Sequence, residues 1–462
     1  MNSSIGSVMA EAKKLFFVGI GGISMSSLAL ACRALGYKVA GSDRTPSEMT
    51  EKLIGNKIKV TIGHDAGNIS GYDAVVYTGA ISDDNPELCA AREKNIPIIY
   101  RADLLGWLML KYRRRIGVSG MHGKSTTTSM IAHVFLSAGE DPTVMIGAET
   151  KEMDGAFRFG EGGDFIFEAC EYKDSFLDMF PTIAVILNID LDHTDYFPDI
   201  DAICDSFGKF ARLPFDSDAE MPMLIACGDD GRVMKIATRS PRDVTFGITN
   251  TDCDYLARNI TEKNGYYSFD VVHDGEPEGR VSLKIPGIHN IYDALAAYAA
   301  CDVCGIPYDK ICSALSDFEG VKRRFEYKGS CDGASVYIDY AHHPTEIEAA
   351  VSAAKKVGKG GRVITLFEPH TFSRTRDHLA EFVETLSKSD LVIMLDIYAA
   401  REINTTGITS SMIADMIPGA MYAPDYDGAA ALVRTFAEDG DIVLILGAGT
   451  IYQIADKLTS FL

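Results

Sequence analysis

Residues 115–128 read Arg-Ile-Gly-Val-Ser-Gly-Met-His-Gly-Lys-Ser-Thr-Thr-Thr. Apolar residues at 116–118 predict a short strand, and residues 126–138 predict a helix, with a glycine-rich turn between the two. In a phosphate-binding loop of this order, backbone N–H groups and the start of the helix face anionic oxygens. The segment therefore predicts a nucleotide site within an α/β sheet.

The turn also supplies the side chains that such a site needs. Lys124 offers a cation to the phosphates, and the hydroxyl of Ser125 is a possible Mg²⁺ ligand. The strict G-x-x-x-x-G-K-[ST] pattern is not met, because Val118 stands where its first glycine belongs. An ordinary turn before a helix is the alternative. The candidate ATP contacts in this segment are Gly120, Met121, His122, Gly123, Lys124, Ser125 and Thr126.

Length and composition indicate a large soluble enzyme. A chain of 462 residues is expected to form about three domains. A net charge of −21 argues against general binding to nucleic acid or to an anionic membrane. The ten cysteines show no paired spacing, the start of the chain does not resemble a signal peptide, and no apolar run is long enough to span a membrane. We therefore expect reduced thiols and a cytoplasmic location.

The first segment contains a second glycine-rich turn. A predicted strand at residues 15–18 leads into Gly19-Ile20-Gly21-Gly22, a helical pattern to Leu35 and a further strand that ends before Asp43. This is a βαβ unit with a dinucleotide-like turn and an acid placed to bind a ribose hydroxyl, although Ser24 replaces the third glycine. A mononucleotide, a nucleotide sugar or no ligand at all would fit the same turn. The basic residues 111–115 read as a linker after this segment.

The middle segment also alternates strands and helices, and acidic clusters follow two of its strands. Strands are predicted at residues 165–167, 183–187, 223–226 and 244–246. The clusters at residues 168–174 and 188–195 lie beyond the ends of the first two, where ligands bind in such sheets. One of these acids and His193, with the hydroxyl of Ser125, would form a Mg²⁺ shell. A solvated acidic loop is the alternative, and for Asp190 and Asp195 it is the favoured one.

The last segment repeats the alternation with strands at residues 336–340, 362–367, 391–395 and 442–446, and a helix is predicted from Asp377. Polar loops at residues 339–344, 368–376 and 447–449 follow three of the strands. We therefore predict an α/β protein of three domains. Residues 1–113 form a Rossmann-like domain, residues 114–324 a P-loop-type central domain, and residues 325–462 a second Rossmann-like domain.

Six motifs in this order resemble the Mur ligases along nearly the whole chain. They lie at residues 19–22, 120–126, 188–193, 286–290, 320–325 and 339–345. The resemblance implies an ATP-dependent bacterial ligase of peptidoglycan synthesis, with Mg²⁺ as cofactor. The reaction that it implies joins L-alanine to the lactyl carboxylate of UDP-N-acetylmuramate through an acyl phosphate. It does not indicate the oligomeric state, which we take as a monomer or a weak homodimer.

The resemblance also implies roles for individual residues. The UDP part of the substrate would be bound by Gly19, Ile20, Gly21, Gly22, Ser42, Asp43 and Thr78. Adenine and ribose would lie near His289, Asn290, Arg324 and Asp339, while Lys124 would contact the phosphates and Ser125, Glu168 and His193 would serve Mg²⁺. His343, His370 and Arg374 would meet the reacting carboxylate and alanine. For the general base, His193 and His343 are both candidates.

The chain departs from the family pattern at four positions. Cys170 replaces an aspartate of the acidic motif, Ser125 a threonine, Asp293 an asparagine and Glu368 a glutamine. Two alternatives stay open. One is a related recycling ligase that adds a ready-made tripeptide to the same nucleotide sugar, although the loop at residues 370–375 is more similar to that of an alanine-adding enzyme. The other is a catalytically silent paralogue that binds nucleotide, and the lost carboxylate at Cys170 is the main argument for it.

Overall fold

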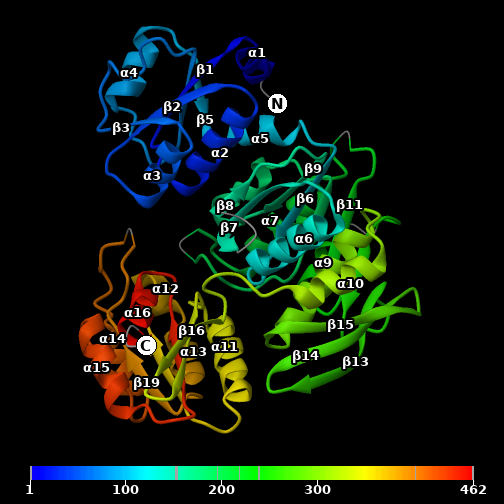
Figure 1. Cartoon of the computed structure of the whole chain (residues 1–462), viewed down its shortest axis with the longest axis vertical. Helices are drawn as coiled ribbons and strands as arrows, with labels where there is room; N and C mark the ends of the chain where they lie inside the picture. The colour runs from blue at the N-terminus through cyan, green and yellow to red at the C-terminus, as the bar shows by residue number, and fades with distance from the viewer. Residues whose placement is uncertain are drawn as a thin grey trace.

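The computed structural model divides the chain into three α/β lobes, each built on its own sheet (Figure 1). An N-terminal lobe leads into a middle lobe, and a C-terminal lobe follows. This arrangement confirms the predicted three-domain α/β class. The structure describes residues 3–150, 155–194, 196–217, 219–237, 240–400 and 402–459. No helix in these ranges is both long enough and apolar enough to cross a membrane.

The N-terminal lobe is a five-stranded parallel sheet in the order β3-β2-β1-β4-β5. The predicted βαβ unit is its first part, and β3 was not predicted. Its strands are β1 (Lys14–Val18), β2 (Lys38–Asp43), β3 (Lys59–Ile62), β4 (Ala74–Tyr77) and β5 (Ile98–Tyr100). Its helices are α1 (Ser3–Glu11), α2 (Ile23–Ala34), α3 (Glu48–Gly55), α4 (Pro86–Glu93) and α5 (Arg101–Met109).

The middle lobe is a ten-stranded mixed sheet in the order β15-β14-β13-β12-β11-β10-β6-β9-β7-β8. The strand that precedes the phosphate loop, β6, lies between the parallel strands β10 and β9. The antiparallel strands β13 to β15 extend one edge and were not predicted. The strands are β6 (Arg114–Ser119), β7 (Thr143–Thr150), β8 (Gly155–Arg158), β9 (Asp164–Glu168), β10 (Ile183–Ile186), β11 (Met223–Cys227), β12 (Val244–Gly247), β13 (Tyr255–Lys263), β14 (Tyr266–His273) and β15 (Glu276–Pro286). The helices are α6 (Lys124–Ala138), a 3₁₀ segment η1 (Tyr172–Asp178), α7 (Ile200–Arg212), α8 (Gly231–Ile236), α9 (His289–Asp302) and α10 (Tyr308–Asp317).

The C-terminal lobe is a six-stranded sheet in the order β16-β17-β21-β18-β19-β20, in which only β16 runs antiparallel to its neighbour. Separate apolar clusters cover its two faces. The strands are β16 (Glu326–Cys331), β17 (Ala334–Asp339), β18 (Val363–Phe367), β19 (Leu391–Met394), β20 (Met421–Tyr422) and β21 (Ile442–Leu446). The helices are α11 (Pro344–Val357), α12 (Phe372–Asp377), α13 (Leu379–Leu386), α14 (Ser410–Met416), α15 (Tyr426–Phe436), η2 (Ile451–Gln453) and α16 (Ile454–Thr459).

Helix α5 joins the N-terminal lobe to the middle lobe through apolar contacts. Leu105 and Leu108 belong to one buried cluster that also contains Phe165 and Phe176 of the middle lobe. A side-chain carbon added at Gly106 would lie 2.6 Å from the ring of Phe180, so the backbone of α5 approaches the middle lobe closely. The two lobes therefore share a continuous core.

Two local predictions were wrong. Arg114 and Arg115 belong to β6 instead of a linker, because their backbone pairs in parallel with the start of β9. Their side chains are bound within the protein too: Arg114 forms an ion pair with Asp164, and Arg115 donates to the carbonyls of Phe180 and Tyr112. The predicted loop at residues 368–376 contains helix α12, which begins five residues before the predicted helix start. Its first N–H groups, from residues 372 and 373, are satisfied by a carboxylate from a distant loop, that of Glu402.

Candidate active site

The phosphate loop requires glycine at two positions. Gly120 and Gly123 have φ angles of 147° and 86°, a region that favours glycine. A side-chain carbon on Gly123 would also lie 2.3 Å from Oδ1 of Asp293. Asn188 fixes the loop from β10, since it accepts from the N–H of His122 at 2.9 Å and donates to its carbonyl at 3.0 Å. The loop is therefore held open at the start of α6.

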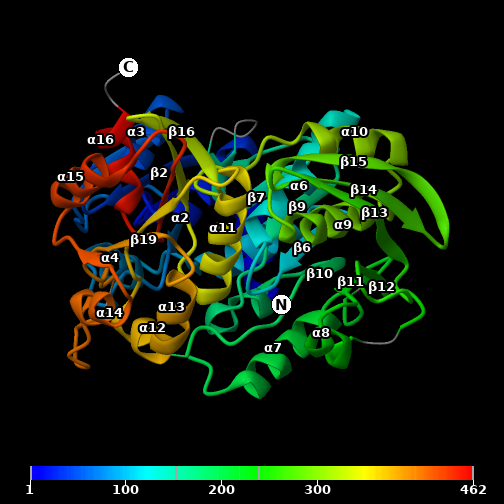
Figure 2. The ribbon, with the colours of Figure 1, turned by 90° about the horizontal axis from the view of Figure 1, so that it is seen from below.

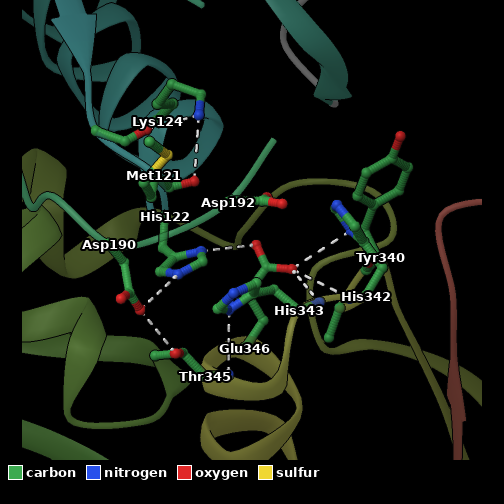
Figure 3. Close-up of polar contacts among 12 residues, drawn as sticks. Met121, His122, Lys124, Asp190, Asp192, Tyr340, His342, His343, Thr345 and Glu346 are labelled. Atoms are coloured by element: carbon green, nitrogen blue, oxygen red, sulfur yellow. Dashed lines mark hydrogen bonds and ion pairs between the residues drawn. The ribbon is translucent and has the colours of Figure 1, made fainter. Parts of the chain in front are cut away.

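Lys124 curls back over this loop (Figure 3). Its ammonium donates to the carbonyls of Gly120 at 2.6 Å and Met121 at 3.2 Å, and lies 3.0 Å from a carboxylate oxygen of Glu171. Burial alone would lower the pKa of Lys124, but the charge of Glu171 more than offsets this and raises the pKa above its usual value. The lysine therefore stays charged although it is buried.

Two of the three predicted metal ligands lie together. The hydroxyl of Ser125 donates to Glu168 at 2.9 Å, and the same carboxylate oxygen accepts from the N–H of Gly147 at 3.0 Å. This pair of oxygen donors suits Mg²⁺. His193 is placed differently, because its Nε2 lies 3.2 Å from the carboxylate of Glu171. The structure thus brings Ser125 and Glu168 together and pairs the histidine with another acid.

A cavity of about 720 Å³ adjoins the phosphate loop and lies between the middle and C-terminal lobes. Its walls come from α6, α9, the loop after β10 and the start of α11. Predicted ATP contacts from segments far apart in the sequence meet here. Those that line it are His122, Gly123, Thr126, His289, Asn290, Arg324 and Asp339. A cavity of this volume has room for a nucleotide.

Helix α11 faces the middle lobe (Figure 2), and a cluster of charged side chains lies between the two (Figure 3) and lines one side of this cavity. Glu346 of α11 lies 3.3 Å from His122, 3.4 Å from His342 and 3.8 Å from Arg324. His122 is also 3.8 Å from Asp190. Burial alone would lower the pKa of His122, but the two carboxylates raise it to about 9. The surrounding cations hold the pKa of Glu346 well below its usual value although burial opposes this.

Known proteins and family models match nearly the whole chain. Three family models match in order: "Mur ligase family, catalytic domain" over residues 14–113, "Mur ligase middle domain" over residues 118–301, and "Mur ligase, glutamate ligase domain" over residues 323–449. The UDP-N-acetylmuramate--L-alanine ligase of Caldanaerobacter subterraneus subsp. tengcongensis is 44% identical over 96% of this chain and 97% of its own length. That of Clostridium novyi is 43% identical over 96% of each chain.

The chain belongs to the Mur ligase family. A solved structure agrees with this assignment. The UDP-N-acetylmuramate-alanine ligase of Thermotoga maritima has a TM-score of 0.79 at 27% identity, over 96% of this chain and 98% of its own. A murein peptide ligase of Psychrobacter arcticus, at 24% identity and a TM-score of 0.70, has the same fold.

In this Mur ligase the N-terminal turn lies apart from the cavity and binds its own neighbours. The N–H groups of Gly19 and Ile20 donate to the carbonyl of Ser42 at 2.9 Å each, and the N–H of Gly21 donates to Asp43 at 2.7 Å. Gly22 precedes α2 as its cap. The hydroxyl of Ser42 is buried and donates a hydrogen bond to the carboxylate of Glu87 at 2.6 Å. The carbonyl and the hydroxyl of Ser42 are therefore both bound within the protein.

Thr78 reaches the same turn from β4. A side-chain carbon added at Gly19 would lie 3.7 Å from its methyl group. The predicted residues at this turn therefore come from three neighbouring strands, β1, β2 and β4. Their roles in substrate binding stay predictions.

Arg374 of this Mur ligase forms an ion pair with an acid of the middle lobe. Its guanidinium donates to Asp192 at 2.9, 3.0 and 3.2 Å, and both side chains are at most 10% exposed. A third nitrogen of Arg374 lies 3.3 Å from Nδ1 of His370. Arg374 and His370 are thus next to each other, and the charge of Arg374 is largely matched within the protein.

His343 has both ring nitrogens occupied. Its Nδ1 accepts from the N–H of Thr345 at 3.3 Å, which caps α11, and its Nε2 lies 3.1 Å from the carbonyl of Leu191. Asp190, for which a solvated loop was favoured, is instead bound by the hydroxyl of Thr345 at 3.0 Å. The loop that carries it is part of the interface between lobes. Asp195, of the same acidic cluster, lies outside the described residues.

Two acids of the site were not predicted as functional residues. Glu171 lies between Lys124 and His193 and is 1% exposed, and its position in the acidic cluster after β9 is the signal that points to it. Glu346 is the third residue of α11 and forms a capping box with His343, the residue that caps this helix. A glutamate three residues after a capping residue is a known signal of a helix start. Cys170 supplies no carboxylate, and burial with the nearby charge of Glu171 raises the pKa of its thiol to about 11.

Proposed function

We propose that the chain is an ATP-dependent ligase that joins L-alanine to the lactyl carboxylate of UDP-N-acetylmuramate in peptidoglycan synthesis. The observation that carries this is the cavity beside the phosphate loop, lined by the predicted ATP contacts of two lobes. Relatives of that name, 41–44% identical over nearly the whole chain, support the choice of substrates. In this proposal residues 1–113 bind the UDP-sugar, residues 114–324 bind ATP, and residues 325–462 bring the amino acid.

The first chemical step makes the carboxylate reactive. A carboxylate repels an amine and has a poor leaving group, so a lactyl oxygen attacks the γ-phosphorus of ATP, ADP leaves, and an acyl phosphate forms. Such a transfer depends mainly on positioning and on charge neutralisation. Lys124 and the N–H groups of the loop supply both, and the ammonium must leave the carbonyls of Gly120 and Met121 to reach the phosphates.

A bound Mg²⁺ would neutralise phosphate charge. Ser125 and Glu168 fit this ion because both offer oxygen atoms, directly beside the start of the phosphate loop. We propose these two residues as its protein ligands. His193 fits less well, because nitrogen is not a preferred ligand of Mg²⁺ and its ring already binds Glu171.

The second step forms the amide. The amine nitrogen of alanine attacks the acyl carbon, inorganic phosphate leaves with the C–O electron pair, and the nitrogen gives up a proton. We propose His193 as the acceptor of that proton. Glu171 binds Nε2 of His193 and leaves Nδ1 for the amine, whereas His343 has both of its nitrogens occupied. Arg374 and His370 would position the substrate from the C-terminal lobe.

Phosphate release tests the proposal. The full chain is assayed with ATP, Mg²⁺ and UDP-N-acetylmuramate, with L-alanine, glycine, L-serine or a muropeptide-type tripeptide as acceptor. The proposal expects fastest release with L-alanine and one new amide per phosphate. Release with the tripeptide alone would instead indicate a recycling ligase. ATP binding without release for any acceptor would indicate a silent paralogue.

A further inference from the structure

Asp293, on α9, is a buried acid with one oxygen to which none of the described residues binds. Its side chain is 5% exposed and lies against the phosphate loop, where its Oδ1 accepts from the hydroxyl of Thr127 at 3.1 Å. Its Oδ2 is buried without a hydrogen-bond partner in the described part of the chain. Asp293 also lines the cavity proposed for ATP. A free polar atom in such a position indicates a missing ligand.

The surroundings disfavour a negative charge on this acid. Arg324 and His122 face it across the cavity and favour the charge, as does Thr127, but burial outweighs them and raises the pKa of Asp293 to about 7. The other ionisable groups of α9 that line the cavity are His289 and Tyr292. Burial lowers the pKa of His289 to about 4, so it brings no cation at neutral pH. An arriving nucleotide adds negative charge and disfavours the carboxylate further.

We propose that Asp293 binds ATP as an uncharged carboxylic acid, whose Oδ2 donates a hydrogen bond to an acceptor atom of the nucleotide. The inference rests on the proposed function because it takes ATP as the ligand of this cavity. Its consequence is a linkage: a protein whose Asp293 is ionised takes up one proton from the buffer when ATP binds. ATP affinity then falls as the pH rises above neutrality, by up to about tenfold per pH unit.

Asp229 provides an internal contrast, because it lines the same cavity in a different state. Its carboxylate accepts from the N–H groups of Ile248, Thr249 and Asn250 and from the hydroxyl of Tyr292. Burial opposes ionisation, but these donors lower the pKa of Asp229 to about 2. Asp229 therefore stays charged at every working pH, and an acid on the cavity wall does not by itself take up a proton.

The test is calorimetric titration of the full chain with the imido analogue of ATP and Mg²⁺, between about pH 6 and about pH 9. Buffers of different ionisation enthalpy report the protons taken up, so the native chain alone gives a result. The Asp293→Asn variant keeps a donor and an acceptor of the same shape but cannot titrate. Because the analogue and His122 titrate in both proteins, the difference between the two isolates Asp293.

We expect the native chain to take up close to one more proton than Asp293→Asn at about pH 8, and its dissociation constant to rise more steeply with pH. At about pH 6, where Asp293 is already largely protonated in the free chain, the two proteins should take up nearly the same number of protons. Equal proton uptake and equal slopes in the two proteins would overturn the inference. If the chain takes up the extra proton on nucleotide binding but ligates no acceptor, only the proposed function is wrong. If it ligates alanine but takes up no extra proton, only the role of Asp293 is wrong.

Discussion

The two junctions between lobes are built from opposite kinds of residue. Helix α5 joins the N-terminal and middle lobes through leucines that share one core with Phe165 and Phe176. The middle and C-terminal lobes meet through His122, Glu346 and other charged side chains around a cavity. Separating the apolar junction would expose its leucines and phenylalanines to water, which costs free energy. Ion pairs can exchange partners with a charged ligand, so the second junction is the one suited to ATP.

The contrast also explains why Lys124 is so heavily bound in the protein itself. Without phosphates, the loop carbonyls and Glu171 hold its charge, because a buried unpaired ammonium would cost several kcal/mol. In the proposed function, the phosphates of ATP take the place of the two carbonyls as partners of the ammonium. The protein thus keeps the charge of this lysine in place before the ligand arrives.

Lys124→Ala, in the phosphate loop next to the polar junction, should give the largest effect. It removes the preorganised cation for phosphoryl transfer, and ligase turnover should fall by about 10²- to 10³-fold. Binding of UDP-N-acetylmuramate, measured by calorimetry, should stay nearly native because the N-terminal turn lies on another lobe. Loss of both properties together would contradict the assignment of the two ligands to separate lobes.

Arg374→Ala should weaken the same junction by leaving Asp192 buried and unpaired. The free energy of unfolding, from denaturant titration, should fall by about 3–5 kcal/mol. A matched double variant that adds Asp192→Asn removes the stranded charge and should recover much of this loss. If the single and double variants are equally stable, the ion pair does not hold the junction.

Leu108→Ala addresses the apolar junction. This side chain is 1% exposed in α5, and its truncation should lower the free energy of unfolding by about 2–5 kcal/mol. The pH dependence of stability should stay that of the native chain, since no charge is removed. Leu108→Met, which nearly conserves volume, is the control and should cost less than about 1.5 kcal/mol. A changed pH profile in either variant would show that the two junctions are coupled.

The sequence predicted the parts of this molecule whose signals are local. The turns at residues 19–22 and 120–126 and the strand–helix alternation identified three α/β domains, because glycine spacing and apolar runs are read within a few residues. The antiparallel strands β13 to β15 were not predicted. Helix α12 also lacked a local signal, since the carboxylate that satisfies its first N–H groups comes from Glu402, some thirty residues later in the chain.

The site followed the same rule. Lys124 and Ser125 could be predicted as phosphate and Mg²⁺ contacts because their motif is contiguous, and most of the other predicted ATP contacts line the cavity. Which side chains form pairs with each other could not be predicted from short stretches of the sequence. His193 meets Glu171 instead of the predicted metal pair, and Arg374 meets Asp192, and both pairings depend on how distant loops are packed.

His122→Asn should give the smallest effect, visible only as a function of pH. The pKa of His122 is about 9 in the folded chain and near 6.5 when unfolded, so the folded state holds its proton more tightly. Its contribution to stability is therefore complete below about pH 6.5 and is lost as the pH rises to about 9. The native chain should exceed the variant by about 1–3 kcal/mol in free energy of unfolding at about pH 6, and by much less at about pH 9.5. A difference that stays constant over this range would show that His122 stabilises the polar junction by packing alone, and that its ion pairs with Asp190 and Glu346 add nothing.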